Sequence, residues 1–428
     1  MLNPIIFAVP VFLLMMAAEL AIARHRGLLL YRAADTVASL SLGIVSQLVG
    51  VFTKVATLGI YTLVFSHAAL WQLPADSPWV WIGALLGYDF CYYWVHRLGH
   101  EVNILWAAHV VHHSSEEYNL STALRQTGTG FLLGWVFYLP MALLGVPPLV
   151  FAVVGLIDLL YQFWVHTRLV GRLGWFDRVF CSPSNHRVHH GQNDYCLDRN
   201  YGGLLIVWDR LFGSFVEERD GEPIVYGVRG PLRSWSPLRA NAQVYAALWQ
   251  DMRLTRRWVD KLRVLTMHPG WRPADAAAAA PKAPYVLADF QRYAPPLPAA
   301  LALHALLQLA VLMAFGLHFL AIAPQLAWAP GLAYAVLLVA QLALLARLCE
   351  RGLAGRALEL ARMAAGVLLV LLSPLHAWGW AAAAGAGALA GAWLLLRSAA
   401  PAVAVAVAVA VAVAAAPPAD ARPGAPAA

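Results

Sequence analysis

Long apolar runs constrain the fold of this chain more than any other feature of its sequence. A helix that crosses a bilayer needs roughly 17 to 25 mostly apolar residues. Because 61% of the 428 residues are hydrophobic and 12% are charged, the composition is far from that of a soluble domain. The sequence therefore predicts an all-α integral membrane protein, built as a multi-span helical bundle. The apolar runs begin near Pro4, Val37, Trp79, Phe131, Leu301, Leu326 and Val367.

Changes in hydropathy and composition divide the chain into regions. Apolar spans at the N-terminus are followed by a mixed stretch, and a second membrane region then leads into an Ala/Val repeat and a Pro/Ala tail. A tail of that composition buries too little apolar surface to fold. We therefore expect N-terminal spans at 1–77, a histidine-rich core at 78–298, a C-terminal membrane region at 299–416 and a disordered tail at 417–428.

Basic residues beside the runs predict how the chain is oriented. An excess of Lys and Arg marks the cytosolic side of a span, and the arginines between positions 24 and 32 follow the first run. The stretch 131–165 is too long for one span and contains Pro147-Pro148, so we expect a hairpin of two short helices there. The stretch from His166 to Pro298 then lies in the cytosol, on the same face as the other clustered histidines.

Charge and composition also bear on partners and location. The formal net charge of +7 reflects Lys and Arg at the ends of spans, so we expect no nucleic-acid partner. The four cysteines form neither a CxxC motif nor a disulfide framework, which favours a reduced compartment. High Ala content with low Lys usage is typical of a GC-rich bacterium. We therefore expect a bacterial inner membrane, with the histidine-rich segment facing the cytoplasm.

Three histidine clusters carry the chemistry. Residues three or four apart share one face of a helix, so a cluster with HxxxH or HxxHH spacing points its imidazoles in one direction. Neutral imidazole is a common ligand of Fe, Zn, Cu and Ni. Eight ligands are too many for one ion, whereas two ions with four or five each would use them all. The clustered residues are His96, His100, His109, His112, His113, His186, His189 and His190.

Other residues near the clusters are candidates for the same site. His166 ends the predicted hairpin and is a further candidate ligand. Glu101 and Asp158 can orient imidazole N–H groups, although Glu101 can equally be a solvated helix residue. Asp158 lies within an apolar run, where an acid is costly unless it has a partner. Arg125 and Gln126 lie where a lipid headgroup is recognised or a lipid phosphate merely touched. The isolated histidines at 25, 67, 268, 304, 318 and 376 are interpreted as structural.

The motifs resemble those of a known family. The three boxes among membrane spans are similar to those of the fatty acid hydroxylase and sterol desaturase superfamily of membrane di-iron oxygenases. Within it, "YYWVHRLGHEVNILWAAHVVHHSSEEYNLSTALRQ" (92–126) and "SPSNHRVHHGQNDYCLDRNYGGLLIVWDRLFGSF" (182–215) resemble the alkylglycerol monooxygenase branch. The resemblance covers roughly residues 78–273. Many members have histidine where this chain has Gln162, four residues before His166.

This resemblance implies a function. It implies two Fe ions held by the eight box histidines, with His166 as a ninth ligand. It implies an O2-dependent monooxygenase that hydroxylates the ether-bearing carbon of alkylglycerols, so that a fatty aldehyde is released. Tetrahydrobiopterin is the reductant of that branch. Because the chain shows no haem domain of the cytochrome b5 kind and no ferredoxin-like cysteine pattern, a separate electron donor is the alternative.

Two other function classes remain open from the sequence. The metal core does not separate ether cleavage from fatty acid hydroxylation, or from sterol or carotenoid desaturation or hydroxylation by the same superfamily. A divalent metal transporter, or a metal-binding membrane protein, would also use histidines. Transport is the weaker alternative, because transported ions need polar ligands inside the spans, whereas the boxes are predicted at the cytosolic ends.

Overall fold

The computed structural model describes residues 4–372, 387 and 391, and throughout these residues the regular elements are helices. The described extended contacts are isolated bridges that pair Phe180 with Leu205 and Gly191 with Tyr226. The predicted all-α class is therefore confirmed. The Ala/Val repeat and the tail predicted at 417–428 lie outside the described residues.

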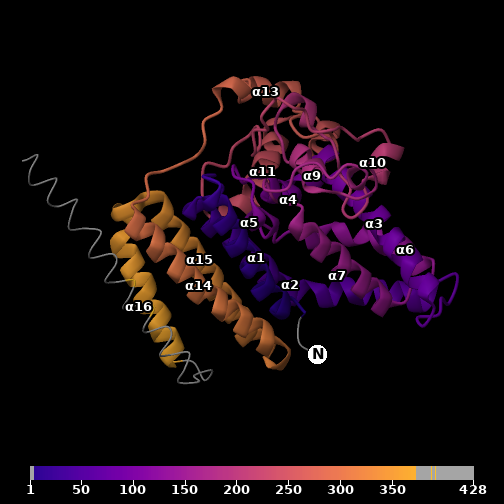
Figure 1. The fold of residues 1–428 in the computed structure, drawn as a ribbon, viewed down its shortest axis with the longest axis horizontal. Helices are drawn as coiled ribbons and strands as arrows, with labels where there is room; N and C mark the ends of the chain where they lie inside the picture. Colours follow the sequence, from indigo (N-terminus) through magenta and orange to yellow (C-terminus); the bar gives the residue numbers. More distant parts are fainter. Residues whose placement is uncertain (1–3, 373–386, 388–390, 392–428) are drawn as a thin grey trace, which may run out of the picture.

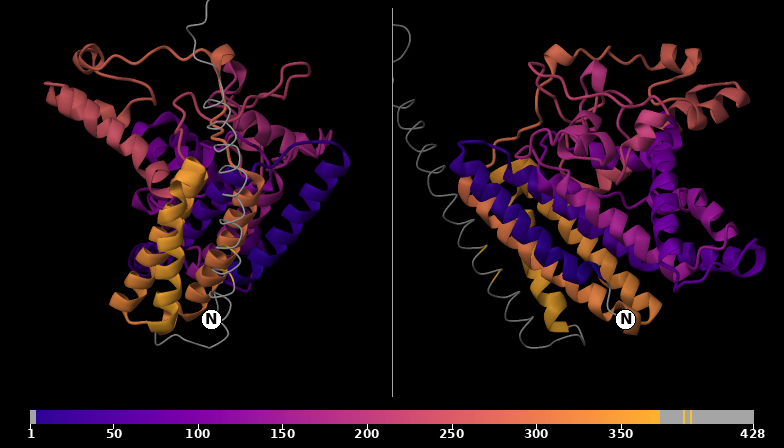
Figure 2. Two further views of the ribbon diagram at one scale, coloured as in Figure 1. Left: turned by 90° about the vertical axis from the view of Figure 1, so that its left-hand side faces the viewer. Right: turned by 45° about the vertical axis from the view of Figure 1, so that its right-hand side comes forward.

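Four helices are long and apolar enough to cross a membrane. They run side by side as a bundle, with indigo and orange helices adjacent in each view (Figures 1 and 2). Each matches a run predicted from the sequence, and together they support the prediction of an integral membrane protein. These helices are α1 (Ile5–His25), α2 (Ala33–Ala68), α14 (Ala299–Ile322) and α15 (Trp328–Arg351).

The remaining runs form helices of other kinds. Helix α3 (Pro78–Glu101) has the length of a span but is not among these four, because polar side chains fill its second half. The second arm of the predicted hairpin is α7. It begins where expected, because Pro148 is the first residue of this helix. The other arm of the hairpin is not one helix but a series of short turns, and Pro140 lies within it. These turns are η1 (Gly130–Leu132), η2 (Gly134–Tyr138) and α6 (Leu139–Leu143), followed by α7 (Pro148–Trp164).

One core joins the N-terminal and C-terminal membrane helices. Val37 and Leu48 of α2 pack in the same buried cluster as Leu309 of α14 and Leu342 of α15. Leu120 and Phe163, which lie close in sequence to predicted ligands, belong to it as well. The bundle therefore supports the histidine-bearing segments directly. The division into regions at 77, 298 and 416 stays a prediction.

A polar cluster lies inside the C-terminal helices. His304 of α14 is fully buried, and its Nε2 lies 2.9 Å from Glu359 of α16 (Arg356–Leu372). Arg362 donates to Glu359, to Gln341 of α15 and to Gln308. The two charged side chains of this cluster, Glu359 and Arg362, thus have partners, as charges within a membrane require. The run predicted near Val367 begins earlier, at Arg356, and its continuation lies outside the described residues.

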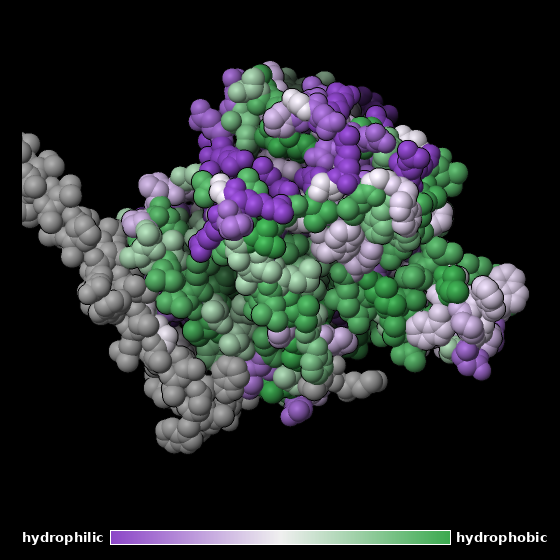
Figure 3. All heavy atoms as spheres, in the orientation of Figure 1, coloured by the Kyte–Doolittle hydropathy of each residue, from purple (hydrophilic) through white to green (hydrophobic). Residues whose placement is uncertain are grey.

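A polar cap, defined here as residues 166–298, covers one end of the bundle. Figure 3 shows hydrophilic side chains gathered over this end and hydrophobic ones around the helices below. Histidine-bearing α4 lies beneath the cap. The helices of this end are α4 (Asn103–His113), α5 (Leu120–Ala123), α8 (Phe176–Val179), α9 (Pro183–His189), η3 (Asp194–Cys196), α10 (Val207–Leu211), α11 (Pro237–Leu254), α12 (Trp258–Thr266), α13 (Ala274–Ala279) and η4 (Leu287–Asp289). In the bundle, the short turn η5 (Ala323–Gln325) follows α14, and η6 (Gly352–Gly355) follows α15.

Candidate metal centre

Each histidine box lies on a helix, as its spacing predicts. The first box occupies the last turns of α3, and the second the last turns of α4. The third occupies α9, where Pro183 is the first helical residue and the Ser182 hydroxyl accepts from the Asn185 backbone N–H. Both are favourable helix starts. Local sequence signals thus explain why even the seven-residue α9 forms and presents its imidazoles together.

The structure brings all nine candidate histidines together in two groups. Within each group, one ring nitrogen from every member lies within 4.8 Å of the others, and nearly all members are buried. We call them the five-histidine set and the four-histidine set. The five-histidine set is His96, His100, His109, His113 and His189. The four-histidine set is His112, His166, His186 and His190.

Each HxxHH motif contributes to both sets, which explains why the pattern occurs twice. In the second box, the first and last histidines join the five-histidine set and the middle one joins the other. In the third box the assignment is reversed. Residues four apart lie on one face of a helix, and the residue between them points slightly aside. One five-residue motif can therefore reach two adjacent ions.

The ring nitrogens within each set have the spacing of metal ligands. Neighbouring Nε2 atoms lie 3.0 to 3.2 Å apart, as in the His100–His113 and His166–His186 pairs. Two ligands at right angles around an ion, each about 2.1 Å away, lie roughly 3.0 Å apart. In addition, Nε2 of His96 is buried without a hydrogen-bond partner among the described residues. The residues present therefore fit two metal ions.

Backbone carbonyls fix the orientation of four imidazoles. Nδ1 of His96 donates to Tyr201 O at 2.6 Å, and Nδ1 of His189 donates to Arg199 O at 2.9 Å. In the four-histidine set, His112 donates to Arg125 O at 3.0 Å and His166 to Gln162 O at 2.8 Å. A proton held on Nδ1 leaves the lone pair on Nε2, which points into the set.

Burial keeps these imidazoles neutral. It lowers the pKa of His112 to about 4, although the hydrogen bond to Arg125 O partly opposes the shift. Burial likewise lowers the pKa of His109, His186 and His190 well below the usual value, and neighbouring imidazoles add to the effect. Because only a neutral imidazole can ligate a metal, both sets are in the ligating form at neutral pH.

The five-histidine set is supported by one strained loop of the cap. Asp198 and Asn200 both have φ of 56°, a left-handed conformation that Asp and Asn tolerate better than most residues. Between and beside them lie the two carbonyls that accept from His189 and His96. Oδ1 of Asp198 also lies 3.8 Å from Nδ1 of His100. This loop thus approaches three members of the set.

Two buried side chains hold that loop in place. Asn200 donates to Val216 O and Asn185 O and accepts from Val216 N, so all its polar groups are used. The Asp209 carboxylate accepts from the backbone N–H groups of Tyr201 and Gly202 at 2.8 and 2.7 Å. Both side chains are fully buried. No local signal in the sequence links Asp209 to a histidine, so Asp209 was not among the predicted site residues.

The four-histidine set is supported by a buried ion pair instead. Arg125 is 1% exposed and lies 3.6 Å from Asp35 of α2. Its Nε donates to Val111 O near the end of α4, while its own carbonyl holds His112. The prediction that Arg125 meets a lipid headgroup or phosphate is therefore wrong, because the guanidinium is enclosed. Gln126, by contrast, lines a cavity that also borders His112 and His166.

The two candidate carboxylates make different contacts from those expected. Oδ2 of Asp158 accepts from Gln162 Nε2 at 2.7 Å, so among the described contacts it reaches His166 only through Gln162. Glu101 accepts from Arg97 at 3.0 Å and is partly exposed. The described contacts include none from either carboxylate to an imidazole. In these described contacts, therefore, neither carboxylate orients a histidine directly.

An acid of the first membrane helix was also missed. Glu19 of α1 is 3% exposed and accepts from the backbone N–H of Leu120 and the hydroxyls of Tyr31 and Thr167. Thr167 directly follows His166. Glu19 thus ties α1 to the segment that follows the second histidine box and to the residue that follows His166. Its location inside an apolar run was the available signal, since an acid there requires partners.

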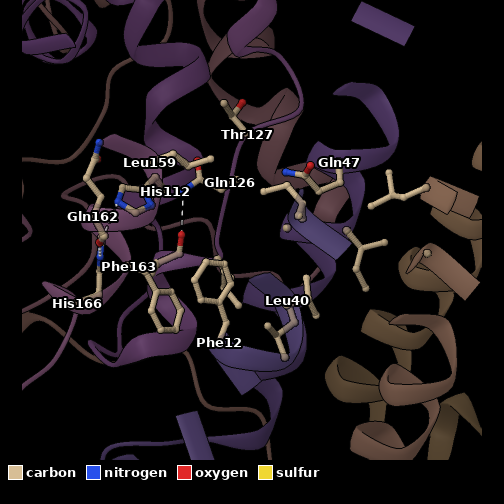
Figure 4. A pocket seen from close by; sticks show the side chains of 18 of the residues that line it. Phe12, Leu40, Gln47, His112, Gln126, Thr127, Leu159, Gln162, Phe163 and His166 are labelled. Atoms are coloured by element: carbon tan, nitrogen blue, oxygen red, sulfur yellow. Dashed lines mark hydrogen bonds between the residues drawn. The ribbon is translucent and has the colours of Figure 1, made fainter. Parts of the chain in front are cut away.

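A cavity of about 310 Å³ connects the membrane helices to the histidines. Apolar side chains of α1, α2, α7 and α14 form most of its wall, and His109, His112 and His166 lie at one end. Figure 4 shows His112 and His166 on one side, with Phe12, Phe163 and Leu40 across from the polar Gln126 and Thr127. The arrangement suits an apolar chain that enters from the bilayer and presents one carbon to the metal centre.

Comparisons with known proteins agree with this site. Residues 81–214 match the fatty acid hydroxylase family model. Alkylglycerol monooxygenase from Homo sapiens is 43% identical over 267 residues, which are 62% of this chain and 59% of that protein. The enzyme of that name from Danio rerio is 47% identical over 239 residues, or 56% of this chain and 53% of that protein.

A less similar relative is named for a different lipid. Ornithine lipid hydroxylase from Rhizobium tropici is 30% identical over 154 residues, covering 35% of this chain and 45% of that protein. No solved structure is significantly similar. The matched region thus spans little more than half the length of the alkylglycerol monooxygenases from man and zebrafish. As the histidine motifs predicted, residues 81–214 match the fatty acid hydroxylase family, and over the aligned region the chain is similar to the alkylglycerol monooxygenases.

Proposed function

We propose that this chain is an O2-dependent membrane monooxygenase that hydroxylates the ether-bearing carbon of alkylglycerols. The observation that carries the proposal is a cavity between apolar helices that is lined by members of both sets of histidines. Similarity to alkylglycerol monooxygenases supports the choice of substrate. The hydroxylated product is a hemiacetal, and its breakdown gives a fatty aldehyde and glycerol.

The two histidine sets are proposed to hold two Fe ions. All nine histidines would serve as ligands, five in one set and four in the other. Imidazole alone does not select iron over zinc, and the similarity to oxygenases is what favours iron. Bound iron would supply the oxygen activation that hydroxylation of an unactivated C–H bond requires.

The chain's own residues supply binding and orientation. Apolar side chains such as Phe12 and Leu40 surround the alkyl chain and exclude water from the cavity. The carbonyls of Arg125 and Gln162 hold His112 and His166 at the end where the reacting carbon lies. Electrons are proposed to come from tetrahydrobiopterin, with a separate electron-donor protein as the alternative.

The membrane placement is also a proposal. We expect the bilayer to surround the four apolar helices and the cap to face the cytoplasm of a bacterial inner membrane. Arg24 and Arg26 at the cap end of α1 favour this orientation. A cysteine introduced at exposed Arg168 of the cap is expected to react only with a reagent on the cytoplasmic side. Reaction from the periplasm alone would reverse the orientation.

A turnover assay tests the proposed reaction. Purified, iron-loaded protein is given an alkylglycerol and O2, with and without tetrahydrobiopterin, and fatty aldehyde is measured. Aldehyde that depends on O2 and the pterin supports the proposal in full. Aldehyde formed only with a reductase and carrier protein would replace the pterin. No aldehyde from protein that holds two irons would reject ether cleavage.

Hydroxylation of another lipid is the second candidate. The relative named as an ornithine lipid hydroxylase favours it, since that protein is 30% identical over 154 residues. The cavity would hold an acyl chain as readily as an alkyl chain. Hydroxylated lipid products with no aldehyde, found by mass spectrometry in the same assay, would favour this candidate.

A further inference from the structure

Three glutamine side chains line the cavity, and they differ in how many partners they have. Gln162 is fully engaged, because it accepts from Tyr92 at 2.6 Å and donates to Asp158 at 2.7 Å. Gln126 uses only its amide nitrogen, which donates to Ala123 O at 2.8 Å. Oε1 of Gln47 is buried without a partner in the described part of the chain. The cavity therefore has spare hydrogen-bonding capacity at two places.

The spare groups include two acceptors. Ala123 O takes one N–H of Gln126, so the carbonyl oxygen and the second N–H of this side chain remain for a ligand. The unpartnered atom of Gln47 is also a carbonyl oxygen. Such an oxygen accepts hydrogen bonds and cannot donate them. A ligand that satisfies this wall must bring donors, and leaving a buried acceptor unpaired is costly.

The charge around the cavity narrows the ligand class. The side chains recorded as lining it include no Lys or Arg, and the one acidic side chain among them, Asp158, accepts from Gln162. Arg125, the neighbour of Gln126, is enclosed in its ion pair with Asp35. An anionic headgroup therefore finds no counter-charge among these side chains, and neutral hydroxyls can supply the donors that Gln126 and Gln47 accept. A lipid with hydroxyl groups on its headgroup meets this description.

The position of Gln126 links headgroup binding to the site of attack. Gln126 directly follows Arg125, whose carbonyl accepts from Nδ1 of His112. Figure 4 shows the Gln126 side chain beside His112, on the opposite side of the cavity from Phe12 and Leu40. A headgroup bound at Gln126 thus lies next to the four-histidine set. The alkyl chain then extends along the apolar wall.

From these contacts we infer that Gln126, assisted by Gln47, binds the headgroup hydroxyls of the substrate and so determines which carbon meets the metal centre. The ligand class is a neutral lipid with hydroxyls a few bonds from the carbon to be attacked. The inference rests on the proposed function, because it assigns the polar end of that function's cavity. Gln126 is thus a specificity-determining residue.

The test compares two lipids that differ only in their hydroxyls. One is an alkylglycerol, and the other is its deoxy analogue, in which hydrogen replaces both hydroxyls. Binding to iron-loaded protein without reductant is measured by displacement of a spin-labelled alkylglycerol. We expect wild type to prefer the diol by roughly 10-fold, and Gln126→Leu to weaken diol binding roughly 5- to 30-fold while leaving the analogue unchanged.

Two further variants control the result. Gln47→Leu should reduce the preference in the same direction by a smaller factor, which keeps the test available if Gln126→Leu fails to fold. Gln325→Leu makes the same substitution at an exposed position outside the cavity, and the preference should stay at the wild-type value. In turnover, Gln126→Leu should raise KM for the diol and allow products oxidised at other carbons.

The outcomes separate this inference from the proposed function. Equal binding of both lipids by wild type, or full preference in Gln126→Leu and Gln47→Leu, would overturn the assignment. A wild-type preference that disappears in Gln126→Leu supports it. If that preference is found but wild type releases no aldehyde, ether cleavage is rejected and the hydroxyl-binding role of Gln126 stands.

Discussion

The five-histidine and four-histidine sets use the same motifs but are supported from opposite sides. The cap loop around Asn200 approaches the five-histidine set, and Asp209 holds that loop. The four-histidine set depends on Arg125 and on Gln162 of α7, whose carbonyls face it from the bundle. Two similar groups of ligands are thus tied to different parts of the fold.

The two ions proposed for these sets would therefore have different surroundings. The four-histidine set has one fewer protein ligand, and two of its members line the lipid cavity. Of the five-histidine set, His109 is the member recorded as lining the cavity. An ion with fewer protein ligands has more positions for O2 or substrate. We therefore expect substrate binding to perturb the four-histidine set more than the other. We expect changes in the cap to perturb the five-histidine set more.

The largest effect is expected when one ligand is removed from each set. His112→Ala and His189→Ala should each lower bound metal from two ions towards one per chain and reduce turnover by at least about 10³-fold, because both ions are needed. Metal per protein is measured together with aldehyde formation. His67→Ala, at the exposed far end of α2, is the control. Full activity in either ligand variant would remove that histidine from the site.

A smaller and selective effect is expected from Asp209→Asn. The substitution weakens the acceptors that hold the Tyr201 and Gly202 backbone, so the carbonyls beside His96 and His189 lose their support. Loss of such support typically costs 10- to 100-fold in metal affinity. In a titration with a chelator, one ion should be released at a lower chelator concentration than in wild type. The other should be released at the same chelator concentration as in wild type. Asp76→Asn, in an exposed loop, is the control; simultaneous release of both ions would contradict selective support.

The residues that sequence predicted well are those with local signals. Helical spacing was enough to gather His109, His112 and His113 on α4, and run length was enough to identify α1 and α14. Both depend on neighbours in the chain. The division of each HxxHH motif between two sets was not predictable, because it depends on where α4 and α9 meet in space.

Supporting residues escaped prediction for the same physical reason. Glu19 meets Leu120 across about one hundred positions, and Asp35 meets Arg125 across ninety. No sequence period encodes such pairs. The cost of an unpaired charge in an apolar region was nevertheless a usable signal at Glu19, as it was at Glu359 in the C-terminal helices. Asp158 shows the limit of that signal, since it predicted a partner but not that Gln162 would be the partner.

Breaking the Asp35–Arg125 pair should affect stability and the four-histidine set together. Asp35→Leu leaves a buried guanidinium without its counter-charge, and such a change typically costs about 3 to 5 kcal/mol. Unfolding in detergent and metal content are measured. The double variant with Arg125→Met should recover part of the stability, because no charge then remains unpaired. The backbone carbonyl of residue 125, which accepts from His112, is still present in the double variant. A full loss of the second ion in that variant would therefore show that the guanidinium itself is required.

The smallest effect is expected at Asp158, where two substitutions separate charge from hydrogen bonding. Asp158→Asn keeps an oxygen that accepts from Gln162 Nε2, whereas Asp158→Leu removes the acceptor and leaves a buried amide unpaired. We expect turnover to fall less than about 5-fold in the first variant and roughly 10-fold in the second, with metal content unchanged in both. If the two variants lose activity equally, the negative charge of Asp158 is what the site needs. Gln162→Leu should reduce turnover at least as much as Asp158→Leu, because it removes the hydrogen bond to Asp158 and also the one from Tyr92.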